Sequence, residues 1–365
     1  MNDHIDAAQP SPVPAPHTFN ARSVSQVMGW VLVALVPATL YGFWLYGWPS
    51  IILWLITLGA TLLGEAFALR LQGKRATPNL LDGSALLTGW LLAMSLPPWA
   101  PWWIGALGGL FAAIFGKQVF GGLGQNPFNP AMVARVALLI SFPLQMTLWV
   151  APLPITSVQA PGLHESIVII LSGGGKAVDA VTSATLLGYS KTELTRGIDL
   201  LHSATASGAP ALSWTGHRQG SLGETASALI MAGGLLLLWL RIISWHIPAA
   251  VLAGIAVPAA IAHGVNPEHY HDATTHLLAG GAILGAFFIA TDYVTSPNTP
   301  AGQLIFGFGV GLLTWIIRTW GGFPEGFAFA VLLMNTLTPI IDRLVKPRIF
   351  GRNRRGKPIE AQRVE

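Results

Sequence analysis

Apolar segments that are long enough to cross a lipid bilayer follow one another along most of the chain. A transmembrane helix needs about 20 mostly apolar residues to span the hydrocarbon core. About ten segments meet this requirement, and they lie near 26–46, 50–70, 80–97, 101–120, 130–149, 223–243, 246–264, 273–292, 301–318 and 325–345. Several are interrupted by glycine or proline. The sequence therefore predicts an all-α polytopic membrane protein with about ten transmembrane helices.

The composition limits the chemistry that such a protein can perform. Only 10% of the residues are charged, whereas soluble domains carry about 25%. The chain has no cysteine, which excludes disulfides, thiolate-bound Fe–S clusters and a cysteine nucleophile within it. Any redox chemistry must then use an organic or a histidine-ligated cofactor. We attribute the net charge of +4 to cytoplasmic loops and not to nucleic-acid binding.

The basic residues predict the orientation in the membrane. Lysine and arginine gather before the first segment and after the second, fourth, sixth and tenth, and Arg318 is an exception to this pattern. Both termini are therefore expected to be cytoplasmic. The predicted organisation is a disordered cytoplasmic tail, a first membrane half, an external loop, a second membrane half and a basic cytoplasmic tail, which cover 1–20, 21–149, 150–222, 223–346 and 347–365.

An internal repeat relates the two membrane halves. Residues 80–93 resemble residues 277–290, and a Pro-Asn motif follows each copy, PFNPA at 127–131 and PNTPA at 297–301. The first copy begins on the predicted inside and the second on the predicted outside, so we expect two inverted five-helix halves. Helices that break at matching positions of inverted halves often mark a ligand or ion site, and a plain loop turn is the alternative.

Two acidic residues fall in or near the apolar segments. Ionisable groups at membrane depth are costly and are therefore candidates for function. Glu65 and Asp82 are accordingly candidates for an ion pathway. The alternative is that each lies at a helix end, where it caps the helix or reaches the interface.

The predicted external loop contains the segment Asp179-Ala-Val-Thr-Ser-Ala-Thr185. Small residues flank a threonine hydroxyl, so the segment is accessible to a modifying enzyme and the hydroxyl is a possible attachment point for a phosphate. An inert loop rich in serine, threonine and alanine remains the alternative.

The segment resembles the flavinylation motif Asp-x-x-(Ser/Thr)-(Gly/Ser)-Ala-Thr. That motif belongs to the family that contains the D subunit of the Rnf electron-transport complex and the B subunit of the Na⁺-translocating NADH:quinone oxidoreductase. Family-like segments cover most of the chain in the expected order: 80–98, 124–143, 290–302 and 332–343. The compact N-terminus favours the Rnf branch.

The resemblance implies the cofactors and their sites. In the family, the last threonine of the motif carries FMN through a phosphoester bond, which corresponds to Thr185 with Asp179, Thr182 and Ser183 in the motif. It also implies a non-covalent riboflavin toward the cytoplasmic side. Residues of the two Pro-Asn regions are the candidates to line that second site: Asn126, Asn129, Asp292 and Asn298.

The resemblance further implies the function and the partners. The chain is expected in the bacterial inner membrane, within a complex that couples NADH and ferredoxin (or flavodoxin) redox to H⁺ or Na⁺ transport. Implied partners are an external FMN-bearing subunit, Fe–S subunits and a flavin transferase for maturation. The competing interpretation is a secondary transporter without a redox cofactor, because inverted repeats and broken helices also occur in transporters.

Overall fold

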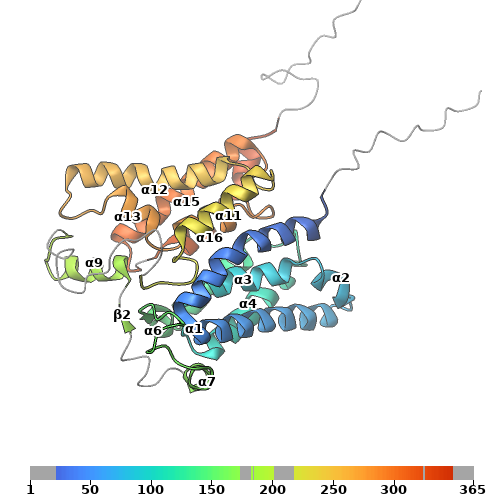
Figure 1. The fold of residues 1–365 in the computed structure, drawn as a ribbon. Coiled ribbons are helices and arrows are strands. Elements are labelled where there is room, and N and C mark those ends of the chain that lie inside the picture. Colours follow the sequence, from blue (N-terminus) through green and yellow to red (C-terminus); the bar gives the residue numbers. More distant parts are fainter. Residues whose placement is uncertain (1–21, 173–181, 184, 201–217, 324, 348–365) are drawn as a thin grey trace, which may run out of the picture.

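A computed structural model describes residues 22–172, 182–183, 185–200, 218–323 and 325–347 of the chain. In these parts the protein is predominantly helical, with two helical groups side by side (Figure 1). Five of the helices are long and apolar enough to cross a membrane: Val24–Leu71, Trp102–Phe120, His246–Val265, Pro300–Trp320 and Phe327–Leu344. The prediction of an all-α polytopic membrane protein is confirmed.

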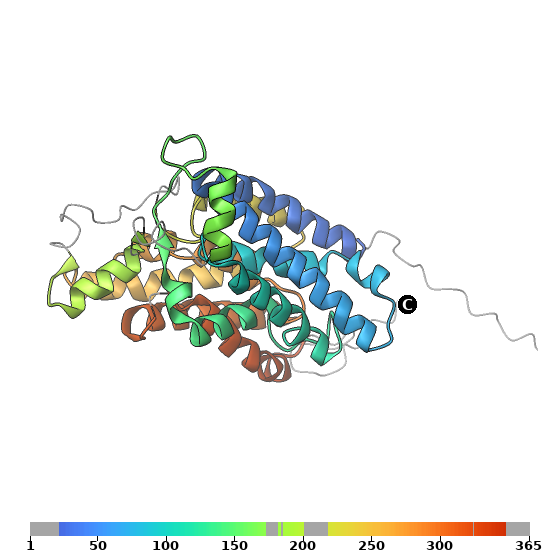
Figure 2. The ribbon, with the colours of Figure 1, turned by 90° about the horizontal axis from the view of Figure 1, so that it is seen from below.

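The first two predicted segments form one kinked helix, α1 (Val24–Leu71). Ser23 and Gln26 form a reciprocal capping box at its start. Gly47 adopts a φ of 69°, which favours glycine, and Pro49 lacks the backbone N–H that would continue the helix. The chain therefore reverses at this point, and the two arms of α1 run back beside each other (Figure 2).

The rest of the first group consists of shorter helices. They are α2 (Ala76–Leu80), α3 (Ser84–Ser95), α4 (Trp102–Ile114), η1 (Gln118–Phe120), α5 (Pro130–Ser141) and α6 (Pro143–Thr147). Twelve residues of α-helix span only about 18 Å, so α3 and α5 are shorter than the predicted segments 80–97 and 130–149. Prolines explain the boundaries, because Pro97 and Pro98 follow α3 and Pro130 begins α5.

The second group repeats this pattern. It contains α11 (Ser227–Trp239), α12 (His246–Val265), α13 (Ala273–Leu278), α14 (Ala282–Leu284), the π-helical turn η2 (Gly285–Ile289), α15 (Pro300–Trp320) and α16 (Phe327–Leu344). The expectation of one continuous helix over 273–292 is wrong. The chain breaks at 279–281, where Gly280 has a φ of 67°.

Equivalent helices of the two groups pack in equivalent ways. The helices α3, α4 and α5 begin at nearly the same sequence separation from α14, α15 and α16. Helix α4 packs along α1 and against α5, while α15 packs along α12 and against α16. Contacts between the groups join α1 to α11 and α5 to α16. A repeated unit of two helices, a broken helix and two further helices therefore builds each half.

Two sets of buried side-chain hydrogen bonds show that the halves are inverted. At the kink of α1, Tyr46 donates to the Arg218 carbonyl, and Arg218 donates to the Leu278 carbonyl at the break of the second half. Glu65 lies about 28 Å further along the second arm, at 1.5 Å per residue. Its carboxylate accepts from the ammonium of Lys117, which follows α4. The same ammonium contacts Ser84, at the start of α3. The break of the second repeat therefore lies at the kink of α1, whereas the break of the first repeat lies toward the far end of its second arm.

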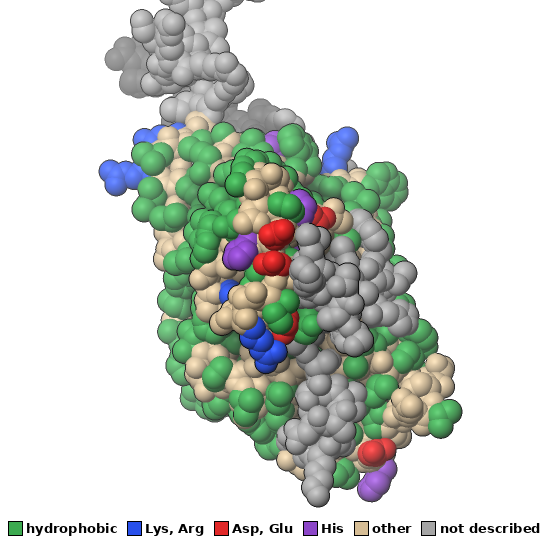
Figure 3. All heavy atoms as spheres, turned by 90° about the vertical axis from the view of Figure 1, so that its left-hand side faces the viewer, with side chains coloured by type: hydrophobic (Ala, Val, Ile, Leu, Met, Phe, Trp, Pro, Cys, Tyr) green, Lys and Arg blue, Asp and Glu red, His purple; other side chains and the backbone are tan. Residues whose placement is uncertain are grey.

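Short elements between the halves gather at the kink end of α1. Strands β1 (Trp149–Val150) and β2 (Thr182–Ser183) pair antiparallel, α7 (Leu163–Ser172) packs against α1, and α9 (Leu186–Thr195) follows β2. Figure 3 shows the face at this end, where acidic, basic and histidine side chains cluster between hydrophobic flanks. This charged face contrasts with the apolar helix surfaces around it.

Candidate functional site

A pocket lies between the two halves, toward the Glu65 end of α1. It has about 740 Å³ of space not filled by atoms, part of which is open to solvent. Apolar side chains form most of its wall, and polar groups from both halves reach it. Its lining includes Val27, Met28, Val31, Ser84, Leu87, Thr88, Lys117, Asn126, Asn129, Pro130, Phe287, Phe288, Thr291 and Asp292. We call this the inner pocket.

The inner pocket brings together Asn129 of the first Pro-Asn motif and Asn126, which directly precedes that motif. Asn126 is 4% exposed, and its Nδ2 donates to the Phe128 carbonyl at 3.0 Å. Within the described part of the chain, its Oδ1 is buried without a hydrogen-bond partner. Asn129 caps α5, because its Oδ1 accepts from the Met132 N–H at 3.2 Å. Asn126 therefore offers an unused acceptor, whereas Asn129 shapes the wall.

The two candidates from the second half are separated by the structure. Asp292 lines the inner pocket, and its carboxylate accepts from the Val294 N–H and the Thr295 hydroxyl. Asn298 lies elsewhere, because its N–H and Nδ2 donate to the two carboxylate oxygens of Asp342 at 3.1 and 3.0 Å. Three of the four predicted residues thus share one pocket, and the fourth holds α15 against the end of α16.

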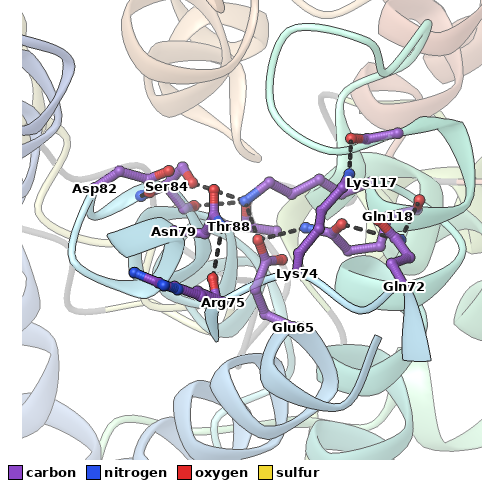
Figure 4. A network of polar contacts seen from close by, with 11 residues as sticks. Glu65, Gln72, Lys74, Arg75, Asn79, Asp82, Ser84, Thr88, Lys117 and Gln118 are labelled. Atoms are coloured by element: carbon purple, nitrogen blue, oxygen red, sulfur yellow. Dashed lines mark hydrogen bonds and ion pairs between the residues drawn. The ribbon is translucent and has the colours of Figure 1, made fainter. Parts of the chain in front are cut away.

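The acidic candidates Glu65 and Asp82 belong to one network of polar contacts beside the inner pocket (Figure 4). The Lys117 ammonium lies 2.7 Å from Glu65 Oε1 and 2.7 Å from Ser84 Oγ. Gln118 donates to the same Glu65 oxygen at 2.6 Å. Asp82 accepts from the backbone N–H and the hydroxyl of Ser84. Asp82 thus supports the start of α3, as the capping alternative predicts.

Lys117 lies near the end of the fourth apolar segment, and the charge pattern predicts no role for it beyond the orientation of the chain in the membrane. Glu65 and Lys117 are 1% and 2% exposed, so each compensates the charge that the other would otherwise bury alone. Glu65 Oε2 has no partner in the structure. The signal that could have found Lys117 is the need of a buried acid for a cation, since Lys117 is the basic residue near the end of the fourth apolar segment.

A second pocket lies at the kink end of α1, next to α9. It has about 370 Å³ of space not filled by atoms, part of which is open to solvent, and it is lined by Trp149, Thr185, Leu186, Leu187, Arg218, Gln219, Glu224, Ala279, Gly280 and Glu325. Thr185 is the N-cap of α9, and its hydroxyl oxygen accepts from the Gly188 N–H at 3.2 Å. The predicted Asp179 lies outside the described residues, and the backbone of Thr182 and Ser183 forms β2. We call this the outer pocket.

The outer pocket contains a buried guanidinium with an unused donor. Arg218 is 4% exposed, and its Nη2 donates to the carbonyls of Glu224 and Leu278. Its Nη1 is buried and has no hydrogen-bond partner among the residues that the structure describes. Burial lowers the pKa of Arg218, and the charge of Glu224 partly opposes that shift. A positive group therefore faces the same cavity as Thr185.

Arg318, the exception to the charge pattern, is explained by a partner from the adjacent loop. Its side chain is fully buried, and Nη2 contacts both carboxylate oxygens of Glu325 at 2.9 and 3.2 Å. Glu325 also accepts from the Gly281 N–H at 3.0 Å, at the break before α14. The charge of Arg318 is therefore neutralised by Glu325. The same carboxylate also fixes the break before α14.

A family model and individual relatives both match nearly the whole chain. The model of the NQR2, RnfD, RnfE family matches residues 12–351. A protein of Halorhodospira halophila is 50% identical over 96% of this chain and 98% of its own length. One of Stutzerimonas stutzeri is 52% identical over 93% and 95%, and one of Escherichia coli is 44% identical over 94% and 98%. Each is named as the D subunit of an ion-translocating oxidoreductase complex.

Proposed function

This chain belongs to the NQR2, RnfD, RnfE family and is a multi-pass membrane subunit of an ion-translocating oxidoreductase complex, and we propose that it holds two flavins. One is FMN bound covalently to Thr185 in the outer pocket. The other is a non-covalent riboflavin in the inner pocket. Flavins accept and release one or two electrons, so the subunit passes electrons between the two ends of the membrane domain.

The position of Thr185 carries the first part of this proposal. An ester at its hydroxyl places a phosphate at the N-terminus of α9, where free backbone N–H groups favour an anion. The unpaired Nη1 of Arg218 lines the same pocket and supplies a further donor. In this proposal, Asp179 helps the flavin transferase to position its metal or to activate the threonine hydroxyl.

The inner pocket supports the second part. Its apolar wall suits a planar aromatic ring, and Phe287 and Phe288 contribute to that wall. The unused Oδ1 of Asn126 suits an N–H or hydroxyl donor of riboflavin. Asn129 and Asp292 hold the neighbouring backbone turns in place.

The outer pocket lies at the kink of α1, and the inner pocket lies toward Glu65 on its second arm. This separation fits electron transfer across the membrane domain. We propose that the inner pocket faces the cytoplasm of a bacterium and the outer pocket faces away from it, with both termini cytoplasmic. The coupled ion is H⁺ or Na⁺, and Glu65 and Asp82 lie on its path. The electron partners are an external FMN-bearing subunit and the Fe–S subunits of the complex. A transporter without redox chemistry does not fit relatives that are oxidoreductase subunits.

Fluorescence of the denatured chain tests the proposal. After coexpression with a flavin transferase, the chain should fluoresce in a denaturing gel under ultraviolet light and gain one FMN in intact mass. A dark chain of unmodified mass would overturn the covalent flavin. Flavin released from the native, purified chain by acid would separately identify the non-covalent one, and its absence would overturn the second site.

A further inference from the structure

The turn between α11 and α12 places an arginine where helices usually end in glycine. Leu240 is the C-cap of α11, and Arg241 follows it with a φ of 53°. The backbone N–H groups of Arg241 and Ile242 close a Schellman motif on the last turn of α11. Glycine takes this left-handed position after α1 and α9, at Gly73 and Gly197. A side chain is strained there, which points to a use for the arginine.

Hydrogen bonds from other elements hold this turn in place. The Tyr293 hydroxyl donates to the Ile242 carbonyl. The Ser244 hydroxyl donates to Oε1 of Gln303, near the start of α15, at 2.6 Å. Arg22, which precedes α1, donates to the carbonyl of the C-cap residue of α11 at 2.8 Å. The turn is therefore fixed from three sides, and a second guanidinium lies at the same helix end.

The turn forms one wall of a groove that has about 1070 Å³ of space not filled by atoms, part of which is open to solvent. Its lining combines apolar side chains, among them Ile243 and Ile247, with Arg241, Trp245 and Tyr293. None of the described residues that line it is acidic. We call this the basic groove.

The basic groove lies at one end of a membrane-spanning helix. His246 begins α12, one of the helices that are long and apolar enough to cross a membrane. Trp239 and Trp245, on either side of the turn, are 79% and 59% exposed. Exposed tryptophans at helix ends are typical of the interface between lipid tails and headgroups. The basic groove therefore opens at the depth of the headgroups.

The charge of the groove is opposite to that of an anionic headgroup. Arg241 is exposed, and its guanidinium has no hydrogen-bond or ion-pair partner in the parts of the chain that the structure describes. Together with Arg22 it outweighs the partial negative charge, about half an electron charge, at the end of α11. Guanidinium groups bind phosphate oxygens through paired N–H donors. Basic pockets between transmembrane helices bind anionic lipid headgroups in this way.

We propose that the basic groove binds one anionic phospholipid. The Arg241 guanidinium donates to the phosphate, the Trp245 ring lies beside the headgroup, and an acyl chain packs along Ile243 and Ile247. A zwitterionic lipid carries its own ammonium group next to the phosphate, so it gains less from the arginine. No step of this inference depends on either proposed flavin.

Native mass spectrometry of the full-length chain in detergent tests the binding. Phosphatidylglycerol should bind more tightly than phosphatidylcholine, and an equal concentration of inorganic phosphate should not displace it. Arg241→Gln should weaken phosphatidylglycerol binding by about tenfold or more, the loss expected for a charge-assisted hydrogen bond. Arg343→Gln is the matched control, because Arg343 is exposed in the last turn of α16 and does not line the groove.

Arg241→Gly separates binding from folding. Glycine adopts the left-handed conformation without strain, so thermal unfolding without added lipid should occur at the wild-type temperature or above it. Phosphatidylglycerol binding should still fall as in Arg241→Gln. Unchanged binding in the glycine variant overturns the role of Arg241. Equal binding of phosphatidylcholine, or displacement by inorganic phosphate, overturns the anionic lipid as the ligand.

The assembled complex tests whether a lipid or a subunit occupies the groove. A photoreactive benzoylphenylalanine in place of Trp245 should, after irradiation of native membranes, form adducts with the mass of a phospholipid. A cross-link to another polypeptide instead would overturn the lipid and assign the groove to a subunit interface.

Discussion

The backbone N–H of Asn129 donates to Oδ1 of Asn335 at 3.2 Å, and this hydrogen bond ties the start of α5 to the middle of α16. Asn335 also donates through Nδ2 to the Thr295 carbonyl at 3.1 Å. One buried amide thus satisfies backbone groups near both Pro-Asn motifs, which belong to different halves. The inner pocket depends on this junction, since Asn129 is part of its wall.

Asn335→Ala should destabilise the protein and loosen the inner pocket. It removes both hydrogen bonds and leaves the buried Asn129 N–H without that partner, at a cost of about 1–3 kcal/mol, whereas the Thr295 carbonyl still accepts from the Thr338 hydroxyl. Thermal unfolding of the purified chain measures the loss. Thr336→Ala is the matched control, because Thr336 is exposed and bonds only within its own helix. Equal stability of the two variants would contradict the role of Asn335.

Asn126→Ala should reduce the amount of non-covalent flavin that copurifies with the chain. The substitution removes the unused acceptor from the inner pocket, and a lost hydrogen bond to a ligand costs about 0.5–1.5 kcal/mol, or roughly a two- to tenfold loss of affinity. Flavin released by acid is measured by chromatography. Asn298→Ala is the control, since Asn298 bonds Asp342 outside the pocket. Flavin loss in Asn298→Ala alone would place the site elsewhere.

Thr185→Ala should remove one FMN from the intact mass of the chain. The phosphoester bond needs the hydroxyl oxygen, and Thr182→Ala keeps Thr185 and should remain labelled. Thr185→Ser keeps a hydroxyl and a good N-cap, so we expect partial labelling. The loss of the cap in Thr185→Ala costs about 1 kcal/mol, which leaves the membrane domain folded. A Thr185→Ala chain that still carries covalent FMN would disprove the attachment site.

Gly311→Ala should destabilise the contact between α12 and α15. A Cβ atom at this position would overlap the Val251 carbonyl oxygen and lie 2.8 Å from Gly254 Cα. Because these are backbone atoms, the helices must separate, and overpacking of this kind costs about 1–3 kcal/mol. Gly59→Ala is the control, because no heavy atom lies within 4 Å of its added Cβ. The two variants are compared by thermal unfolding in detergent.

Single cysteines in this cysteine-free chain should report its orientation. We expect Lys74→Cys to react with an impermeant thiol reagent only from the cytoplasmic side. We expect His164→Cys, in α7, to react only from the opposite side. Labelling is measured on intact cells and on inverted vesicles. Labelling of both positions from one side would exclude the proposed path between the two pockets.

The hydrophobic pattern and the repeat determined the fold class without any structure. Long apolar segments have one stable outcome in a membrane, because their backbone groups must bond within the segment. The kink at Gly47 and the start of α5 at Pro130 follow from local rules for glycine and proline. Family membership was likewise predicted from motifs and is confirmed over residues 12–351. These features depend on residues that are near one another in the sequence.

Contacts between distant segments were decided only by the tertiary structure. Lys117 and Glu65 are 52 positions apart, and Asn129 and Asn335 are 206 apart. No local rule assigns such partners, because a buried charge or amide requires some partner but does not specify which. Packing of the inverted halves made that choice. It brought Asn126, Asn129 and Asp292 to one pocket, and it gave Asn298 to Asp342.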